Sequence, residues 1–300
     1  MRNTLLIIGV VCMLAFHSCN TCSRRQTVDV TVNLADLVRD SAYFDMARRV
    51  LYSLPTPVEM SILIKNLGIP WNSELLNDPE KASEYLTSNK MALNLGAYLT
   101  NLTYSGLFDQ SQMALRYKLA IGQLIEGLGL QSAINFSTLQ ELEQNINDKD
   151  RVLRIISDTY YSCAALLNES ERYALTLRIL AGGWVESMYI ATNMLNYHLI
   201  SNESQIQQLI IDQILTFDLL WQAMTDLQDV PGVDDLFGDL LELAQLFDTI
   251  GIFHTENIVT VLADSDISEI SSESITTVTP EEFENIKLRI LILRENFTNT

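Results

Sequence analysis

Helix-start signals recur along this chain, and they constrain its fold more than any other feature. Thr279-Pro280 with Glu282 combines a capping residue, a proline in the first turn and a glutamate at the capping-box position. Each such start is followed by apolar residues three and four apart, the spacing of one helix face. We therefore expect an all-α domain of about ten helices. They are predicted near residues 43–54, 57–67, 89–107, 110–128, 138–146, 149–166, 169–199, 204–228, 234–251 and 280–297.

The composition agrees with a folded helical chain. Hydrophobic residues make up 48% of the sequence, and its 300 residues include only 12 Gly and 6 Pro. A weak internal repeat appears at an offset of 60, where Gly122 aligns with Gly182 and Glu126 with Glu186. This repeat predicts stacked helical hairpins, as in an α-solenoid. The alternative is an irregular helical array, because any two amphipathic helices share some similarity.

The first residues resemble an export signal. Met1-Arg2 carries a positive charge, an apolar run follows from Leu5 to Phe16, and Cys19 comes directly after a small residue. We expect residues 1–18 to be a signal peptide and Cys19 to be lipidated, which would anchor the protein to a membrane of the bacterial cell envelope. The alternative is an ordinary signal peptide cut nearby, which leaves Cys19 and Cys22 as thiols or as a small disulfide.

The rest of the chain divides by composition. Residues 19–42 are a polar tether, and 43–255 form the helical domain. Residues 256–278 are β-prone and acidic, which predicts either a short hairpin or a linker. A C-terminal helix in 279–300 carries one continuous apolar stripe, so we expect it to dock on the domain. The stripe consists of Phe283, Ile286, Ile290, Leu293 and Phe297.

Charge is distributed unevenly along the chain. Residues 179–286 contain no Lys or Arg, while the whole protein has a formal net charge of −19. Nucleic acid is excluded as a partner, because phosphate binding needs clustered Lys and Arg. Electrostatic adhesion to anionic lipid is disfavoured for the same reason, which leaves the Cys19 anchor as the expected membrane contact. We predict one acidic surface that serves a basic protein or peptide, the alternative being a solvated face. Its candidate residues are Asp212, Asp226, Asp229, Asp234, Asp235, Asp239 and Glu242.

No catalytic pattern is present in the sequence. His198 and His254 each lack the spaced partner that a zinc site or a Ser-His pair requires. The acidic segments 226–235 and 264–266 do not follow the EF-hand spacing, so no calcium site is assigned. We expect neither an enzyme, nor a cofactor, nor a metal ion.

The segment from Ala181 to Tyr189 is the most unusual helical stretch. Its two glycines each cost about 1 kcal/mol relative to alanine in a helix, so close helix packing should compensate. A polar pocket is the alternative interpretation of the segment. Its candidate residues are Glu126, Trp184, Glu186 and Tyr189.

A resemblance to a family rests on three motifs of this chain. They are Asn94-Leu-Gly96-x-Tyr98, Asn168-Glu-Ser-Glu171-Arg172 and Ala181-Gly-Gly-Trp184-Val-Glu186-x-x-Tyr189. Together they resemble an uncharacterised family of predicted lipoproteins from Gram-negative, gut-type bacteria, over most of residues 45–297. The resemblance implies helical content and an envelope location, and it carries no site.

These observations favour an interaction or scaffold role. We expect the protein to sit on the periplasmic side of a membrane or at the cell surface, held by Cys19 and presenting a helical surface to a protein or peptide. The alternative is a small-molecule or cation-binding lipoprotein with its pocket near Trp184 and Glu186.

Overall fold

The computed structural model describes the greater part of the helical region. The chain divides into two compact units, residues 1–39 and 40–300, and every described residue belongs to the second. The expected signal peptide, Cys19 and the tether lie outside the described residues. The structure describes residues 70–131, 172–194, 203–228, 230, 232–250 and 278–300, strand residues between 253 and 275, and isolated positions in 61–68 and 141–162.

The described part of the chain is all-α apart from a small β-hairpin. It holds six α-helices with complete bounds, preceded by two short 3-10 helices, η1 (Ser73–Leu75) and η2 (Pro79–Glu84). This is fewer than the ten helices expected, and the predicted helices near 43–54, 57–67, 138–146 and 149–166 lie wholly or largely outside the described residues. The six are α4 (Ser88–Leu107), α5 (Ser111–Leu128), α8 (Tyr173–Met194), α9 (Glu203–Asp226), α10 (Asp234–Thr249) and α11 (Pro280–Thr298).

A side-chain cap begins two of the four α-helices whose N-caps the structure describes, α4 and α11, but not α5 or α10. Thr279 caps α11 through the expected capping box, in which its side chain accepts from the Glu282 amide and the Glu282 carboxylate accepts from the Thr279 amide. Asp109 directly precedes the predicted helix near 110–128 but does not cap it. Asp109 has a positive φ of 61° in the turn after α4, and Gln110 takes the N-cap position of α5 without a side-chain hydrogen bond.

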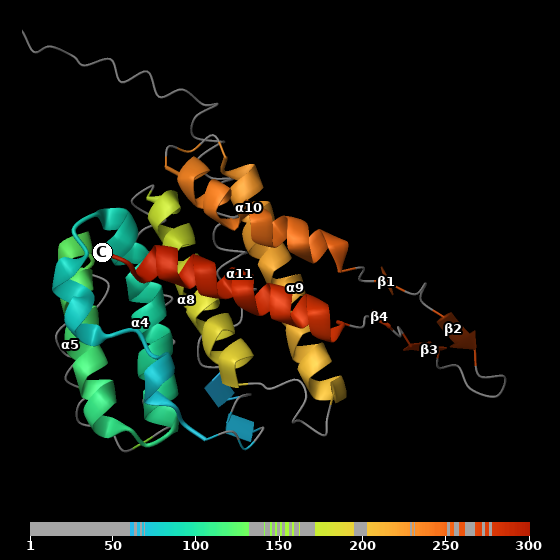
Figure 1. Ribbon diagram of the computed structural model, residues 1–300, viewed down its shortest axis with the longest axis horizontal. Coiled ribbons are helices and arrows are strands. Elements are labelled where there is room, and N and C mark those ends of the chain that lie inside the picture. Colours follow the sequence, from blue (N-terminus) through green and yellow to red (C-terminus); the bar gives the residue numbers. More distant parts are fainter. Residues whose placement is uncertain are drawn as a thin grey trace, which may run out of the picture. The chain divides into compact units, whose positions relative to one another are not determined.

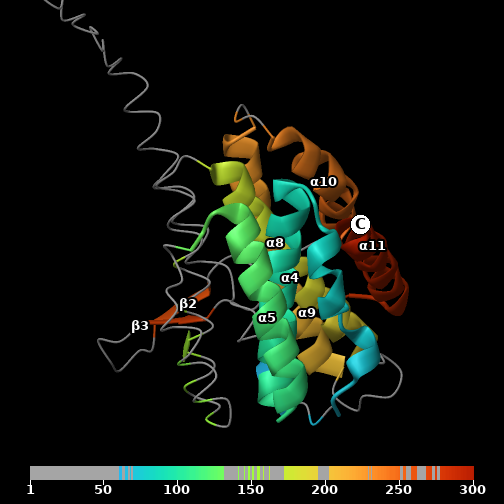
Figure 2. The same ribbon diagram turned by 90° about the vertical axis from the view of Figure 1, so that its left-hand side faces the viewer.

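Helix α4 lies at the centre of the packing. It packs against α5 on one side and α8 on the other, and α9 packs on the far side of α8 (Figure 1). Figure 2 shows the same order from the side of α5. Helix α10 contacts α9, while α11 runs across α8 and α4 and also contacts α10. The order α5, α4, α8, α9 therefore forms a layer, and α11 crosses over it.

Glycines allow α4 and α8 to touch through their backbones. A Cβ added at Gly182 would lie 1.9 Å from the carbonyl oxygen of Leu93, and one at Gly96 would lie 2.0 Å from that of Ile179. The Thr100 hydroxyl, on the same face, donates to the Gly183 carbonyl oxygen at 3.1 Å. The expected compensation for glycines in this helix is thus a close helix crossing.

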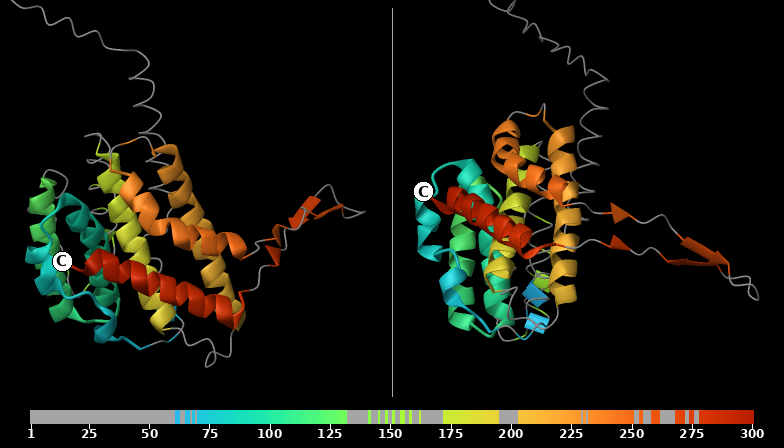
Figure 3. Two further views of the ribbon diagram at one scale, coloured as in Figure 1. Left: turned by 45° about the horizontal axis from the view of Figure 1, so that its top comes forward. Right: turned by 45° about the vertical axis from the view of Figure 1, so that its right-hand side comes forward.

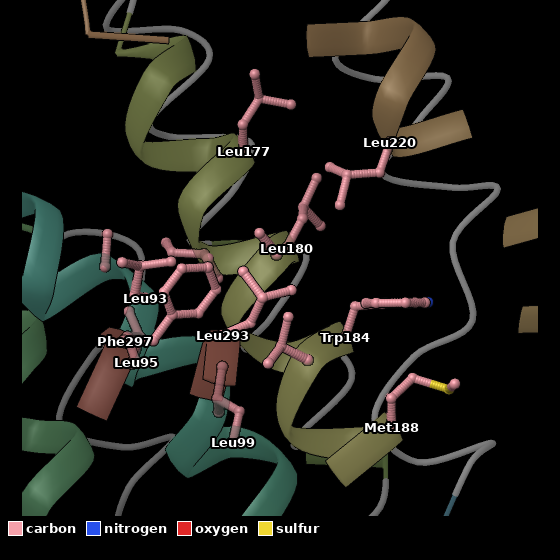
Figure 4. Close-up of a cluster of buried hydrophobic side chains, with 14 of the residues drawn as sticks. Leu93, Leu95, Leu99, Leu177, Leu180, Trp184, Met188, Leu220, Leu293 and Phe297 are labelled. Atoms are coloured by element: carbon pink, nitrogen blue, oxygen red, sulfur yellow. The ribbon is translucent and has the colours of Figure 1, made fainter. Parts of the chain in front are cut away.

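The apolar stripe of α11 is buried. Leu293 and Phe297 enter the space between α4 and α8, among leucines from both helices (Figure 4). The end of the helix is held as well, because Lys90 Nζ donates to the carbonyl oxygens of Asn296 and Asn299, each at 2.6 Å. A cation at a helix C-terminus satisfies carbonyl groups that have no partner within the helix. All five stripe residues, Phe283, Ile286, Ile290, Leu293 and Phe297, are at most 4% exposed.

The β-prone segment between α10 and α11 contains paired strands. β1 (Phe253–His254) pairs antiparallel with β4 (Ser274–Ile275), and β2 (Ile258–Val261) pairs antiparallel with β3 (Ser268–Ser271). The strands lead from the end of α10 and return to the start of α11, as Figure 3 shows. The chain thus reverses here, which allows α11 to run back along α10.

Candidate functional site

The first candidate site is centred on Glu186, which is completely buried on α8. Its partner is Arg294 of α11, whose Nε lies 2.8 Å from Glu186 Oε2 and whose Nη2 lies 3.2 Å from Oε1. Arg294 Nη2 also donates to the Leu75 carbonyl oxygen at 3.0 Å. The two-point contact is the strong form of the Arg–carboxylate pair, so the negative charge of Glu186 is fully matched inside the protein.

The surroundings of Arg294 favour its charged form. Burial alone would lower the pKa of Arg294, but the adjacent Glu186 carboxylate and its hydrogen bonds raise it above the ordinary value. The guanidinium also lies over the ring of Tyr189, 4.2 Å from its centroid. Glu186, Tyr189 and Arg294 therefore form one polar cluster that ties α11 to α8.

Trp184 belongs to a different cluster. Its ring centroid lies 5.1 Å from that of Phe217 on α9 and 6.3 Å from that of Phe247 on α10. Figure 4 shows its indole directed away from Leu293 of α11. Trp184 and Glu186 point to different neighbours because residues two apart on a helix differ by about 200° in direction. The aromatic rings connect α8 to α9 and α10.

Glu126 is not brought together with these residues. It is exposed on α5, whereas Glu186 is enclosed between α8 and α11. The glycines that precede them also differ, since a Cβ at Gly122 would meet nothing within 4 Å while one at Gly182 would meet backbone. The two glutamates that the internal repeat aligns thus have different environments. Of the four predicted pocket residues, only Glu186 and Tyr189 share a cluster.

A second candidate site is a groove between α10 and α11. It has a volume of about 590 Å³. Glu242 of α10 and Arg289 of α11 form an ion pair across it. The apolar part of the lining comes from Leu246 and Leu288, and Leu288 is 55% exposed. The lining residues, which define the α10–α11 groove, are Glu242, Gln245, Leu246, Thr249, Asn285, Leu288 and Arg289.

The predicted acidic residues that the structure describes are exposed, but they lie on two helices and have different neighbours. Asp212 and Asp226 lie on α9, and the Asp212 carboxylate accepts a hydrogen bond from Gln208 at 2.7 Å. Asp229 lies outside the described residues. The exposed members of the set are Asp212, Asp226, Asp234, Asp235, Asp239 and Glu242.

Cations from outside the Lys- and Arg-free stretch balance part of this charge. Arg178, only 2% exposed, is the last cation before the stretch. Its burial lowers its pKa, while Asp235, Asp239 and Asp234 of α10 act in the opposite direction. Burial and the neighbouring Asp235 raise the pKa of Asp239, although Arg178 and Lys90 partly oppose this shift. The start of α10 therefore faces a buried counter-charge, whereas Asp212 and Asp226 belong to another helix.

Two buried polar side chains were not singled out by the sequence. Asn101 and Ser105 lie one turn apart on α4 and are completely buried. The amide nitrogen and oxygen of Asn101 and the hydroxyl of Ser105 have no hydrogen-bond partner. Such atoms are costly to bury unpaired, and a bound water would satisfy them. A sequence signal exists, because both are polar positions in the interior of a helix whose residues are mostly buried.

Other predicted positions have no site geometry in the structure. Within the described residues no three His, Cys, Asp or Glu side chains are grouped closely enough to hold a metal ion. His198 and Asp264 lie outside the described part of the chain. Among the helices whose placement is described, none combines the length and the apolarity that crossing a membrane requires.

Comparisons of the chain with protein-family models, with curated proteins and with solved structures found no match.

Proposed function

We propose that this protein is a membrane-anchored helical scaffold of the bacterial cell envelope that binds a protein or peptide partner. The observation that carries the proposal is how the chemistry-bearing side chains are used. Glu186 is bound by Arg294 inside the protein, and the Trp184 ring packs against Phe217 and Phe247. The partly apolar α10–α11 groove, in contrast, remains open at the surface.

The same contacts rank the two functions proposed from the sequence. A small-molecule pocket near Trp184 and Glu186 would need free volume and an unpaired polar group. Both carboxylate oxygens of Glu186 already accept hydrogen bonds from Arg294. The buried Trp184 Nε1 has no hydrogen-bond partner, but its ring is packed against Phe217 and Phe247, which leaves a ligand little room beside it, so we favour the interaction role. We propose the layer of α5, α4, α8 and α9, in which α4 rather than α5 adjoins α8, as the basis of the scaffold.

The envelope location rests on the leader that ends before Cys19 and on the lipoprotein resemblance. Replacing Cys19 by Ser should release the protein from membranes, because a diacyl or triacyl anchor supplies about 0.8 kcal/mol per buried methylene. The test is fractionation of cells that express each form. Continued partition of Cys19→Ser with membranes, at wild-type levels, would show that another element holds the protein there.

The binding role is tested by photo-crosslinking in cells. A photoreactive amino acid at Leu288, in the α10–α11 groove, should give a discrete adduct with one partner. The matched control is the same amino acid at Leu119 on α5, which is 65% exposed and equally apolar. Both positions are accessible, so a difference between them reports a partner rather than exposure. An absence of adducts from both positions, in cells with full-length protein, would contradict the scaffold role.

A further inference from the structure

We propose that the α10–α11 groove binds a basic amphipathic helix, with the apolar face of the helix on Leu288 and its Lys or Arg side chains among the surrounding carboxylates. This inference rests on the proposed function and names the kind of partner that the surface fits. It commits to a peptide segment in helical form.

The apolar element of the surface lies mainly on α11. Leu288 and Ile292 are one turn apart on this helix and are 55% and 37% exposed. Leu241, 38% exposed, stands on the neighbouring helix α10. Residues four apart lie on one face of a helix, so Leu288 and Ile292 form one apolar strip on which the apolar face of a bound helix can lie. Leu246 adds an apolar side chain to the groove itself.

Carboxylates surround this apolar element. Glu281 and Glu295 are exposed on the same side of α11 as Leu288, because the helical period places them within about 40° of it. Asp248 is exposed on α10, beside Gln245 of the groove lining. The only cation among the lining residues is Arg289, and its charge is matched by Glu242.

This charge pattern selects one occupant over the others. Basic side chains at the edge of a bound helix would be attracted by Glu281, Glu295 and Asp248, which also steers encounter. A second copy of this chain would place the same carboxylates opposite one another, because a two-fold interface is self-complementary. An anionic lipid surface would be repelled for the same reason. The apolar anchors and the acidic rim together therefore fit a basic amphipathic helix.

The direct test is peptide binding by the purified full chain carrying Cys19→Ser. The probe is a fluorescent helical peptide with Leu along one face and Lys on the other. Two controls are the same peptide with Glu in place of Lys and a scrambled peptide of identical composition. Fluorescence anisotropy should show binding of the Leu/Lys helix alone. Its affinity should fall at least about fivefold when salt rises from about 50 to about 300 mM, since rim charges are screened.

Variants separate the groove from the rest of the surface. Leu288→Ser should weaken binding about tenfold, because an exposed leucine becomes buried only in the complex. Glu281→Gln should weaken it about threefold at low salt and have little effect at high salt. The matched controls are Leu119→Ser on α5 and Asp212→Asn on α9, which should bind as wild type. All four positions are exposed, and circular dichroism verifies that each variant is folded.

Each outcome decides between interpretations. Equal binding of the Lys and Glu peptides, or wild-type affinity in Leu288→Ser, would overturn the inference. Concentration-dependent dimers in sedimentation that Leu288→Ser abolishes would overturn it in favour of a second copy. If crosslinking at Leu119 traps a partner while the Leu/Lys helix fails to bind, the scaffold role stands and this inference fails. If the helix binds but no position yields an adduct in cells, the groove chemistry stands and the scaffold role fails.

Discussion

The same substitution at two aligned glycines should change stability in opposite directions. Gly122 of α5 and Gly182 of α8 occupy equivalent places in the internal repeat and lie in the interior of their helices. Alanine favours a helix by about 1 kcal/mol over glycine. At Gly122 a new Cβ meets nothing within 4 Å, so this gain is retained. We expect Gly122→Ala to raise the free energy of unfolding by about 1 kcal/mol.

At Gly182 the new methyl group cannot be accommodated in place. It would lie 1.9 Å from the Leu93 carbonyl oxygen, whereas carbon–oxygen contacts are normally about 3.3 Å or more. The α4 and α8 backbones must separate by about 1.4 Å to restore a normal contact, since the clashing atoms are backbone and no side chain can rotate away. Overpacking a core typically costs up to about 3 kcal/mol. A clash with backbone should cost about that much or more, because the backbone cannot move aside as a side chain can. After the helix gain, Gly182→Ala should still lose about 2 kcal/mol or more.

Thermal and urea unfolding followed by circular dichroism measure both effects. For a chain of this size, 1 kcal/mol corresponds to a shift of about 2–4 °C in Tm. Gly122→Ala should melt higher than wild type and Gly182→Ala at least about 4 °C lower. Gly96→Ala should behave like Gly182→Ala, and the double variant should cost less than the sum, because one separation relieves both clashes. Wild-type stability of Gly182→Ala would refute the close α4–α8 crossing.

Three other substitutions test the packing of α11 and the charge of α10. Arg294→Met should lower the free energy of unfolding by about 3–5 kcal/mol, because it leaves Glu186 buried without its counter-charge. Adding Glu186→Gln should recover part of this loss, measured as the urea midpoint. A double variant no more stable than Arg294→Met alone would contradict the pairing. Leu293→Ala should lower the free energy of unfolding by about 2–4 kcal/mol, because it opens a cavity between α11 and its neighbours. A loss of less than about 1 kcal/mol would contradict the burial of this side chain. Asp239→Asn should raise Tm at pH 8, because burial raises the pKa of this carboxyl in the folded state and disfavours its charged form. Protonation of Asp239 stabilises the folded wild type as pH falls through that raised pKa, so the Tm difference between Asp239→Asn and wild type should shrink between pH 8 and pH 4. A Tm difference that grows as pH falls would contradict the raised pKa.

Local sequence chemistry predicted helix bounds well where the cap is local. The capping box of Thr279 and Glu282 fixes the start of α11 at the expected residue. The stripe spacing of Phe283 to Phe297 likewise predicts which face of the helix is buried. The start of α5 was predicted less well, because Asp109 adopts a left-handed turn conformation that short polar residues tolerate. A capping residue and a turn residue look alike in a sequence.

The partner of Glu186 could not be predicted in the same way. Arg294 lies 108 residues further along the chain and contacts Glu186 only because α11 crosses α8. In the sequence, Arg294 is a polar position adjacent to an apolar stripe, where a solvent-exposed cation is the usual interpretation. The charge balance around α10 has the same origin. Arg178 immediately precedes the Lys- and Arg-free stretch, yet the fold places it near Asp235 and Asp239.

The surroundings of α8 determine where binding is to be sought. Its glycines face α4, Trp184 faces α9 and α10, and Glu186 faces α11. Because each of these faces is already covered by another helix, substitutions on α8 should act on stability before they act on recognition. Leu288 differs, since it is 55% exposed and its replacement removes little packing from the folded state. A substitution there that abolishes binding while leaving Tm unchanged would therefore identify recognition itself, which no substitution on α8 can do.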